Sequence, residues 1–212
     1  MKIAIAGAIA VTGVALLAGC TTMTKDQCLA GAWGEKGYQD GLAGYPASHL
    51  NDHVEACAKY GAAPDSRSYL SAREESLRTY CTWENGFQQG RQGNIYAGVC
   101  LPAEEATFVP AFEDGRRIHA AEQAVSWAQS ALNSAINRIG DREDKLEAKE
   151  RELRQPGLTD EERQRVRDRI REVRGEIHDA RRNARRAEDD LRQAESEARA
   201  VRSLIGSRYG LW

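Results

Sequence analysis

The stretch Gly37-Tyr38-Gln39-Asp40-Gly41-Leu42-Ala43-Gly44 recurs further along the chain as Gly86-Phe87-Gln88-Gln89-Gly90-Arg91-Gln92-Gly93. Both read Gly-aromatic-x-x-Gly-x-x-Gly. Spacings of four and three place the glycines on one face of a helix, where missing side chains let another backbone come close. Glycine costs about 1 kcal/mol relative to alanine at each helical position, so we expect tight packing at all six. These packing glycines are Gly37, Gly41, Gly44, Gly86, Gly90 and Gly93. Glycine-rich turns remain the alternative interpretation.

The chain begins with the features of a secretory signal. Lys2 precedes an uncharged run over 3–17, which is shorter than the roughly 20 residues of a membrane-spanning helix. Leu17-Ala18-Gly19-Cys20 resembles the lipobox of bacterial lipoproteins. This resemblance implies a signal peptide over 1–19, lipid attachment at Cys20 and a lipidated polar tether over 20–27. Thr21, rather than Asp, resembles the signal for transfer to the outer membrane.

Four further cysteines bracket the glycine repeats. Cys28 and Cys57 flank the first repeat, and Cys81 and Cys100 flank the second. An even set in an exported chain predicts two disulfides. One disulfide per repeat is the simplest connectivity, although the other two pairings stay open. With apolar residues at helical spacing between the repeats, we predict a small, disulfide-stapled, mostly helical domain over 28–117.

The second half of the chain has a different pattern. From Ile118 it is rich in Ala, Glu, Arg and Gln, and apolar residues recur at intervals of three and four on both sides of Gln155-Pro156-Gly157. These heptads predict a long antiparallel coiled-coil hairpin over 118–205. A capping-box pattern, Thr159 with Glu162, marks the start of the second helix. Residues 206–212 form the predicted C-terminal tail, which we expect to fold back near the hairpin base.

The register of the hairpin can also be predicted. Setting Ile118 opposite Val201 and Leu153 opposite Val166 places large residues mostly against alanine, whereas a slide of one heptad would bring two cations together at the seam. We favour the first alignment. Arg142 and Lys149 occupy seam positions, so we expect the tip half to be looser than the base. Pairing of the heptads between two chains stays open. The predicted fold class is all-α.

Two kinds of chemical site were tested against the sequence. His49, His53 and Cys57 lie at i, i+4 and i+8, and two histidines four apart can chelate zinc or copper. Because Cys57 is expected to be oxidised, we interpret them as polar residues on a solvated helix and predict no metal and no cofactor. Asp40, Asp65 and Glu84 show no spacing that requires an acid–base pair, and the sequence has no Gly-x-Ser-x-Gly or His-Glu-x-x-His motif. We therefore predict no catalytic residues.

The balance of charge bears on the partners. Thirty Lys and Arg residues face 32 Asp and Glu residues, a net charge of −2. A nucleic-acid binder would show a basic surplus, so we predict no nucleic-acid partner. The basic cluster Arg181-Arg182 with Arg185-Arg186 is answered by Glu188-Asp189-Asp190, as on a solvated helix face.

The framework of cysteines and glycines resembles a family of proteobacterial lipoproteins, domain of unknown function twenty-seven ninety-nine (DUF2799). Family members often carry glycine where this chain has Arg73, in a third and weaker repeat around Tyr69. The family implies a location in the cell envelope and no assigned activity. The residues that carry the resemblance are Cys28, Trp33, Gly37, Asp40, Gly41, Gly44, His53, Cys57, Gly61, Pro64, Asp65, Tyr69, Tyr80, Cys81, Gly86, Gly90, Gly93, Tyr96, Cys100 and Gly115.

These observations leave three classes of function. We expect an envelope lipoprotein without enzymatic activity, anchored in the outer membrane and facing the periplasm, whose hairpin binds or spaces an envelope protein or a cell-wall partner. The second class is a ligand or metal sensor in the glycine-repeat domain, with His49 and His53 as the first residues to test. The third is an envelope enzyme with a cleft between the repeats.

Overall fold

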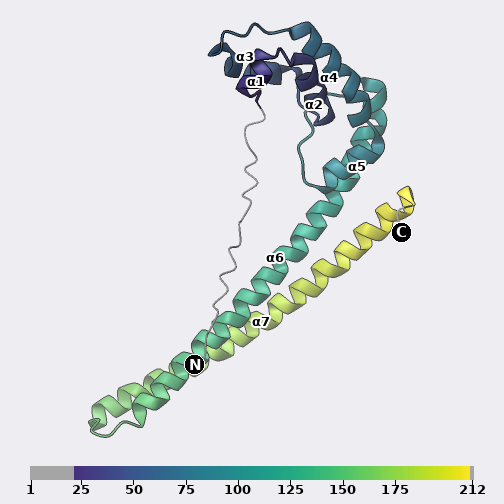
Figure 1. Ribbon diagram of the computed structural model, residues 1–212. Coiled ribbons are helices and arrows are strands. Elements are labelled where there is room, and N and C mark those ends of the chain that lie inside the picture. The colour runs from purple at the N-terminus through teal and green to yellow at the C-terminus, as the bar shows by residue number, and fades with distance from the viewer. Residues whose placement is uncertain (1–21, 211–212) are drawn as a thin grey trace, which may run out of the picture. The chain divides into compact units, whose positions relative to one another are not determined.

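A computed structural model describes residues 22–210, and this range is helical apart from short connections (Figure 1). It contains no β-strand, so the predicted all-α class is confirmed. The signal peptide, Cys20 and the last two residues lie outside the described range. None of the described helices combines the length and apolar character needed to cross a membrane.

The chain divides into two units at Tyr80/Cys81, with residues 97–99 joining the first. The predicted domain boundary at 117/118 does not coincide with this division. Helix α6 (Pro102–Leu153) runs through residues 117 and 118 without a break. Tertiary contacts, which the sequence pattern does not report, set the observed division.

Unit 1 is built from four short helices. A buried cluster that includes Met23, Trp33, Leu50 and Tyr69 forms its core, and the Cys28–Cys57 disulfide lies within the same cluster. The helices are α1 (Lys25–Leu29), α2 (Trp33–Leu42), α3 (Leu50–Ala58) and α4 (Ser66–Tyr80), with the 3-10 turn η1 (Ala47–His49) before α3.

Unit 1 begins earlier in the chain than predicted. Thr24 caps α1: its hydroxyl accepts a hydrogen bond from the Gln27 N–H, and the Gln27 side chain accepts one from the Thr24 N–H. Met23 is buried in the core. The prediction of a polar tether over 20–27 is therefore wrong from Met23 onward, because this capping box and the burial of Met23 fix the segment.

The first glycine repeat lies on α2 and packs against α4. A Cβ atom on Gly37 would come within 2.1 Å of the Tyr69 carbonyl oxygen, and one on Gly41 within 2.4 Å of the Arg73 carbonyl oxygen. Only glycine permits this approach of two backbones. The prediction of tight packing is thus correct for these two positions.

The third glycine of the repeat has another role. Gly44 lies beyond α2 with φ +73°, and its N–H donates to the Gly41 carbonyl. The next N–H, from Tyr45, donates to the carbonyl of Asp40, which completes a Schellman motif. Gly44 therefore ends the helix, although a side chain there would also meet the ring of Tyr80.

The second repeat, on α5 (Trp83–Arg91), is built in the same way within unit 2. A Cβ on Gly90 would come within 1.9 Å of the Phe112 carbonyl oxygen of α6, and Gly93 ends the helix with φ +77°. Gly86 faces the carbonyl of Phe108. The Cys81–Cys100 disulfide belongs to this unit, so both disulfides follow the simplest predicted connectivity.

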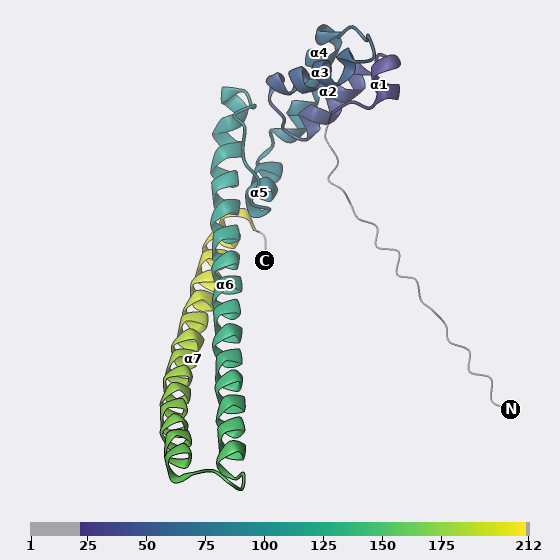
Figure 2. The ribbon, with the colours of Figure 1, turned by 90° about the vertical axis from the view of Figure 1, so that its left-hand side faces the viewer.

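Helices α6 and α7 (Asp160–Tyr209) lie side by side as an antiparallel hairpin (Figure 2). The ion pairs that join them include Glu122–Arg202, Glu143–Arg181 and Glu150–Arg174, at N–O distances of 2.9, 2.6 and 2.9 Å. The slide of one heptad that sets Lys149 opposite Arg163 would place the partners of each pair about 12 residues, or roughly 18 Å, apart along the helix axis. These ion pairs therefore agree better with the predicted register than with that slide.

The tip half of the hairpin is not looser, contrary to prediction. Val166, Ile170 and Val173 of α7 are all buried. Arg142 and Lys149 are only half-exposed at the seam, and their charges pair with Glu176 and Glu152. The aliphatic parts of these two side chains therefore pack in the seam.

The end of α7 returns to the hairpin base. The ring of Tyr209 stacks on Trp83 of α5 at a centroid distance of 5.2 Å, and its hydroxyl donates to Asp114 Oδ2 over 3.0 Å. Gly210 then ends the helix with φ +64°. The contact near the hairpin base agrees with the prediction, but residues 206–209 continue α7 and do not fold back as a separate tail.

Candidate functional site: a buried carboxylate cluster in unit 1

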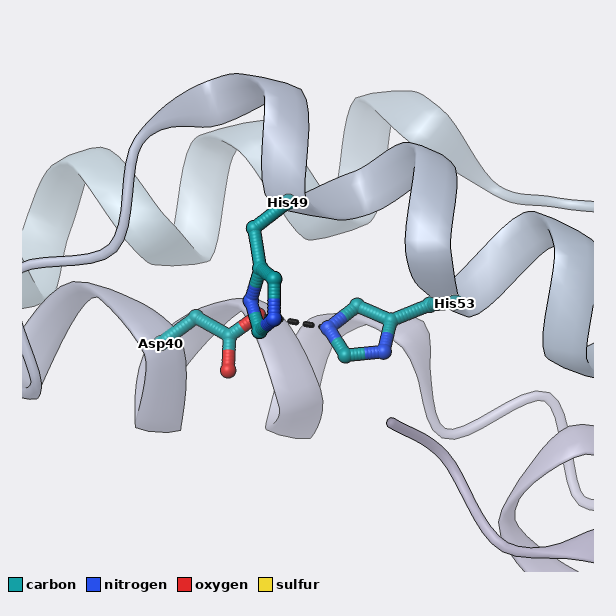
Figure 3. Close-up of side chains that lie close together, drawn as sticks. All are labelled: Asp40, His49 and His53. Atoms are coloured by element: carbon teal, nitrogen blue, oxygen red, sulfur yellow. Dashed lines mark hydrogen bonds and ion pairs between the residues drawn. The ribbon is translucent and has the colours of Figure 1, made fainter. Parts of the chain in front are cut away.

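A single oxygen of Asp40 accepts three hydrogen bonds inside unit 1. Oδ2 lies 2.5 Å from Tyr69 Oη, 2.7 Å from His53 Nε2 and 3.0 Å from His49 Nδ1. Figure 3 shows the two imidazoles gathered beside this carboxylate. The other oxygen, Oδ1, lies 3.3 Å from Lys36 Nζ. We call Asp40, His49, His53 and Tyr69 the Asp40 cluster.

Each member of the Asp40 cluster comes from a different element. α2 supplies Asp40, η1 supplies His49, α3 supplies His53 and α4 supplies Tyr69. The two histidines are four residues apart, so successive helical turns direct them to the same side. The cluster therefore connects all the helices of unit 1 that follow α1.

The prediction of solvated histidines is wrong. His53 is fully buried and His49 is 9% exposed. Cys57, the third residue of the predicted series, is oxidised as expected and pairs with Cys28. The periodicity was correct, but it gave no sign of the carboxylate on α2 that both rings face.

The hydrogen bonds of His53 determine where its proton resides. The backbone N–H of Met23 can only donate, and it lies 3.3 Å from His53 Nδ1. Nδ1 therefore offers its lone pair, and Nε2 carries the proton that is donated to Asp40. His53 is neutral with both nitrogens engaged, and it fastens the segment before α1 to the cluster.

Burial and hydrogen bonding act in opposite directions on the Asp40 carboxyl. Burial alone would raise its pKa, but hydrogen bonds from Tyr69 and His53, together with the charge of Lys36, outweigh burial and hold the pKa below its ordinary value. Burial lowers the pKa of the His53 imidazole more than Asp40 raises it. Burial and the neighbouring carboxylate both raise the pKa of the Tyr69 hydroxyl. The cluster thus holds an ionised carboxylate beside the neutral imidazole of His53 and the neutral hydroxyl of Tyr69.

This arrangement can in principle hold a metal ion. Ligand atoms of Asp40, His49 and His53 all lie within 4.8 Å of one another. However, a metal at His53 Nε2 would move the proton to Nδ1, where it would face the N–H of Met23. The hydrogen-bond pattern therefore favours a structural role, in which the cluster holds the helices of unit 1 together, rather than a metal site.

The second glycine repeat lacks the cluster. Gly37 faces Tyr69 in the first repeat and Gly86 faces Phe108 in the second, so these aromatic residues correspond. Asp40 correspondingly aligns with Gln89. The same helix packing is achieved in unit 2 without the carboxylate or the phenol, so the Asp40 cluster is not required by the glycine packing itself.

Other carboxylates considered in the sequence lie elsewhere. Asp65 is exposed and accepts a hydrogen bond from the Ser68 N–H at the start of α4, and Glu84 is exposed on α5. Sequence reasoning did not identify Tyr69 and Lys36 as partners of Asp40. The one available signal was that Lys36 precedes Asp40 by a helical turn.

Residues 32–117 match the family model described as "Protein of unknown function (DUF2799)". The match spans both glycine repeats of this all-helical, disulfide-stapled fold. This part of the chain is thus similar to that family, as its cysteines and glycines predict. Searches of curated proteins and of solved structures give no significant match.

Proposed function

We propose that this protein is a non-enzymatic lipoprotein of the outer membrane, facing the periplasm, in which the α6–α7 hairpin binds an envelope protein or a cell-wall partner. The lipobox-like sequence supports the anchor at Cys20. Met23 is already buried in unit 1, and three residues span at most about 11 Å. A lipid on Cys20 would therefore hold unit 1 close to the bilayer.

The observation that carries this proposal is an uncharged surface on α6. Residues 123–137 contain no Asp, Glu, Lys or Arg, although 29% of the chain is charged. Trp127 in this stretch is 71% exposed. Its neighbours one helical turn away are Gln123, Ala124, Ser130 and Ala131, which are small or uncharged. We call residues 123–137 the Trp127 face.

Hairpin pairing does not explain the Trp127 face. The stretch of α7 opposite it, residues 182–196, carries many charges outside the seam, as is usual for solvated helices. An exposed tryptophan among small residues is instead typical of the central part of a protein interface. The absence of nearby charge allows a partner to approach without desolvating an ion.

Site-specific photo-crosslinking in cells tests the role of the hairpin. A photoreactive residue replaces Gln123, beside Trp127, in the full-length protein, and a control carries it in place of Arg185 on α7. We expect a discrete crosslinked species from the Trp127 face alone, and we expect Trp127→Glu to abolish it. Equal products from both positions, or products unaffected by Trp127→Glu, would rule out this face as the binding element.

Metal sensing at the Asp40 cluster is the second candidate function. It is favoured by the proximity of three possible ligands, Asp40, His49 and His53, and opposed by the proton on His53 Nε2. Titration of the protein with zinc or copper, with His49→Ala/His53→Ala as the control, decides whether the cluster binds metal. Failure to bind at micromolar metal excludes the sensor.

A further inference from the structure

Two adjoining hollows lie along one flank of the hairpin, between the tip halves of α6 and α7. One has a volume of about 410 Å³ and the other a volume of about 320 Å³. Arg174 lines both, so we treat them as a single groove and call it the tip groove. Neither the Asp40 cluster nor the Trp127 face includes any residue that lines it.

A row of cations with a heptad period forms the α7 side of the tip groove. Arg167, Arg174 and Arg181 line it at intervals of seven residues, and each directly follows a residue of the seam. Arg171 and His178 line it between them. On the opposite flank of α7, the positions that directly precede the seam carry both signs of charge. The positive charge of this part of α7 is therefore concentrated on the side of the groove.

The acidic residues of the tip groove neutralise two members of this row. Glu150 pairs with Arg174, and Glu143 pairs with Arg181. Within the range that the structure describes, these are the only acidic side chains that line the groove. The charge of the groove is therefore balanced toward the hairpin base and positive toward the tip.

The arginines at the tip end of the groove are open to an incoming acid. Arg154, which directly follows α6, and Arg167 are exposed. Within residues 22–210, no ion pair or hydrogen bond engages either of these two side chains. Arg171 pairs with Asp168 on its own helix, an exposed ion pair of the kind that contributes little to stability. These three guanidinium groups can therefore accept carboxylates from a partner.

The floor of the tip groove is apolar. Leu146 and Leu153 of α6 and Ile170 and Ile177 of α7 line it. The isoleucines are buried, whereas the leucines are partly exposed and can make further contacts. Each of these two pairs repeats after seven residues, so the floor and the row of cations share one period.

We propose that the tip groove binds an acidic amphipathic helix of a partner protein. A helix laid along the hairpin presents the same face every seven residues, about 10 Å, which is the period of both the row and the floor. Its apolar residues cover the partly exposed leucines, and its carboxylates meet Arg154, Arg167 and Arg171. A uniform polyanion such as a polyphosphate matches the cations but gains nothing from an apolar floor.

The tip groove and the Trp127 face are separate surfaces. Trp127 directly precedes its neighbour in the seam, Ala128, whereas the cations of the row directly follow theirs. Residues before and after the seam flank opposite sides of an antiparallel hairpin. Loss of binding at one surface therefore leaves the other intact, and the two proposals can fail separately.

Fluorescence anisotropy with the purified full-length protein in detergent tests the proposal. The probe is a labelled synthetic helix about three heptads long, with leucine on one face and glutamate beside it. Its two controls carry lysine in place of glutamate or serine in place of leucine. We expect only the glutamate–leucine helix to bind, and more weakly as salt is added. Arg167→Gln/Arg171→Gln should weaken its binding about fivefold, as for the loss of two exposed ion pairs.

Arg165→Gln/Arg186→Gln is the matched control, because it removes the same charge from the opposite flank of α7, and it should leave binding unchanged. Equal losses in the two double variants, or no binding of the glutamate–leucine helix at micromolar concentration, would overturn the proposal. Equal binding of the lysine helix or of the serine helix would overturn it as well, because charge sign or the apolar floor would then be irrelevant. Self-association of the protein that Arg167→Gln/Arg171→Gln abolishes would make a second copy the occupant and contradict a separate partner.

Discussion

At Asp40 the three donors to one oxygen do not contribute equally. Tyr69 Oη makes the shortest contact, 2.5 Å, and a hydrogen bond to an ionised group typically contributes about 1.5–3 kcal/mol. Phe108 occupies the corresponding position in the second repeat, so a phenylalanine side chain fits between such helices. The Tyr69 hydroxyl can therefore be removed without disturbing the packing.

We expect Tyr69→Phe to lower the free energy of unfolding of unit 1 by about 1.5–3 kcal/mol. Urea unfolding followed by circular dichroism measures the change. Tyr38→Phe removes a hydroxyl from a tyrosine that is 43% exposed, and it should change stability by less than about 0.5 kcal/mol. Equal effects of the two substitutions would show that the bond to Asp40 contributes nothing.

The lowered pKa of His53 predicts that acid destabilises unit 1. The unfolded chain binds a proton at this imidazole near pH 6.5, whereas the folded chain resists it. The contribution of His53 to the stability of unit 1 is therefore fully present above about pH 6.5, and it declines as the pH falls below that value. Asp40, whose pKa is also lowered, adds a further loss near pH 4 and below.

Thermal unfolding at pH 7.5 and pH 5.5 checks this sign. We expect a lower melting temperature at pH 5.5, and we expect His53→Gln to reduce the difference, because glutamine does not titrate. The other titratable groups near His53 are Asp40, His49, Tyr69 and Lys36. A melting temperature that rises on acidification would contradict the assignment of a neutral His53.

At the scale of helices, glycine has opposite effects at different positions. A Cβ on Gly90 of α5 would lie 1.9 Å from the Phe112 carbonyl oxygen, whereas one on Gly140 of α6 meets nothing within 4 Å. Gly90→Ala must push α5 away from α6. Gly140→Ala only removes backbone freedom from the unfolded chain.

We therefore expect Gly90→Ala to destabilise unit 2 by about 2 kcal/mol or more. Gly140→Ala should stabilise it by about 0.5–1 kcal/mol. Chemical denaturation of the two single variants measures both. Destabilisation by both substitutions, to a similar degree, would show that the loss at Gly90 does not come from helix contact.

The helices and the face along which α6 and α7 pair were predictable because they depend on local periodicity. Ile118 and Val201 belong to the heptad pattern of the seam. The disulfide between Cys28 and Cys57 was predictable because the two cysteines flank one glycine repeat. The role of Gly44 was not predictable from spacing, because a glycine that ends a helix and one inside it can both follow at i+3. His49 and His53 were misread for a related reason: their partner, Asp40, lies on another helix, and no local period reports a long-range pair.

For the whole molecule, the two units have separate means of stabilisation. Unit 1 has its core around Trp33 and the Cys28–Cys57 disulfide, while unit 2 has a core around Phe87 and Ile118 and the Cys81–Cys100 disulfide. The first disulfide closes a loop with a sequence separation of 29 residues. In the chain-entropy description, closing a loop of this size stabilises the folded state by about 3–4 kcal/mol.

We expect Cys28→Ser/Cys57→Ser to destabilise unit 1 by about 3–4 kcal/mol and to leave the hairpin unaffected. Hydrogen exchange of the full-length protein, read separately for α2–α4 and for α6–α7, measures the two effects in one experiment. Cys81→Ser/Cys100→Ser is the matched control, and it should weaken protection in α5 and the start of α6 while sparing α2. If the first double variant instead loosened the seam around Val173 and Ile177, the two units would have to unfold together. The hairpin could not then keep its partner-binding face while unit 1 opens.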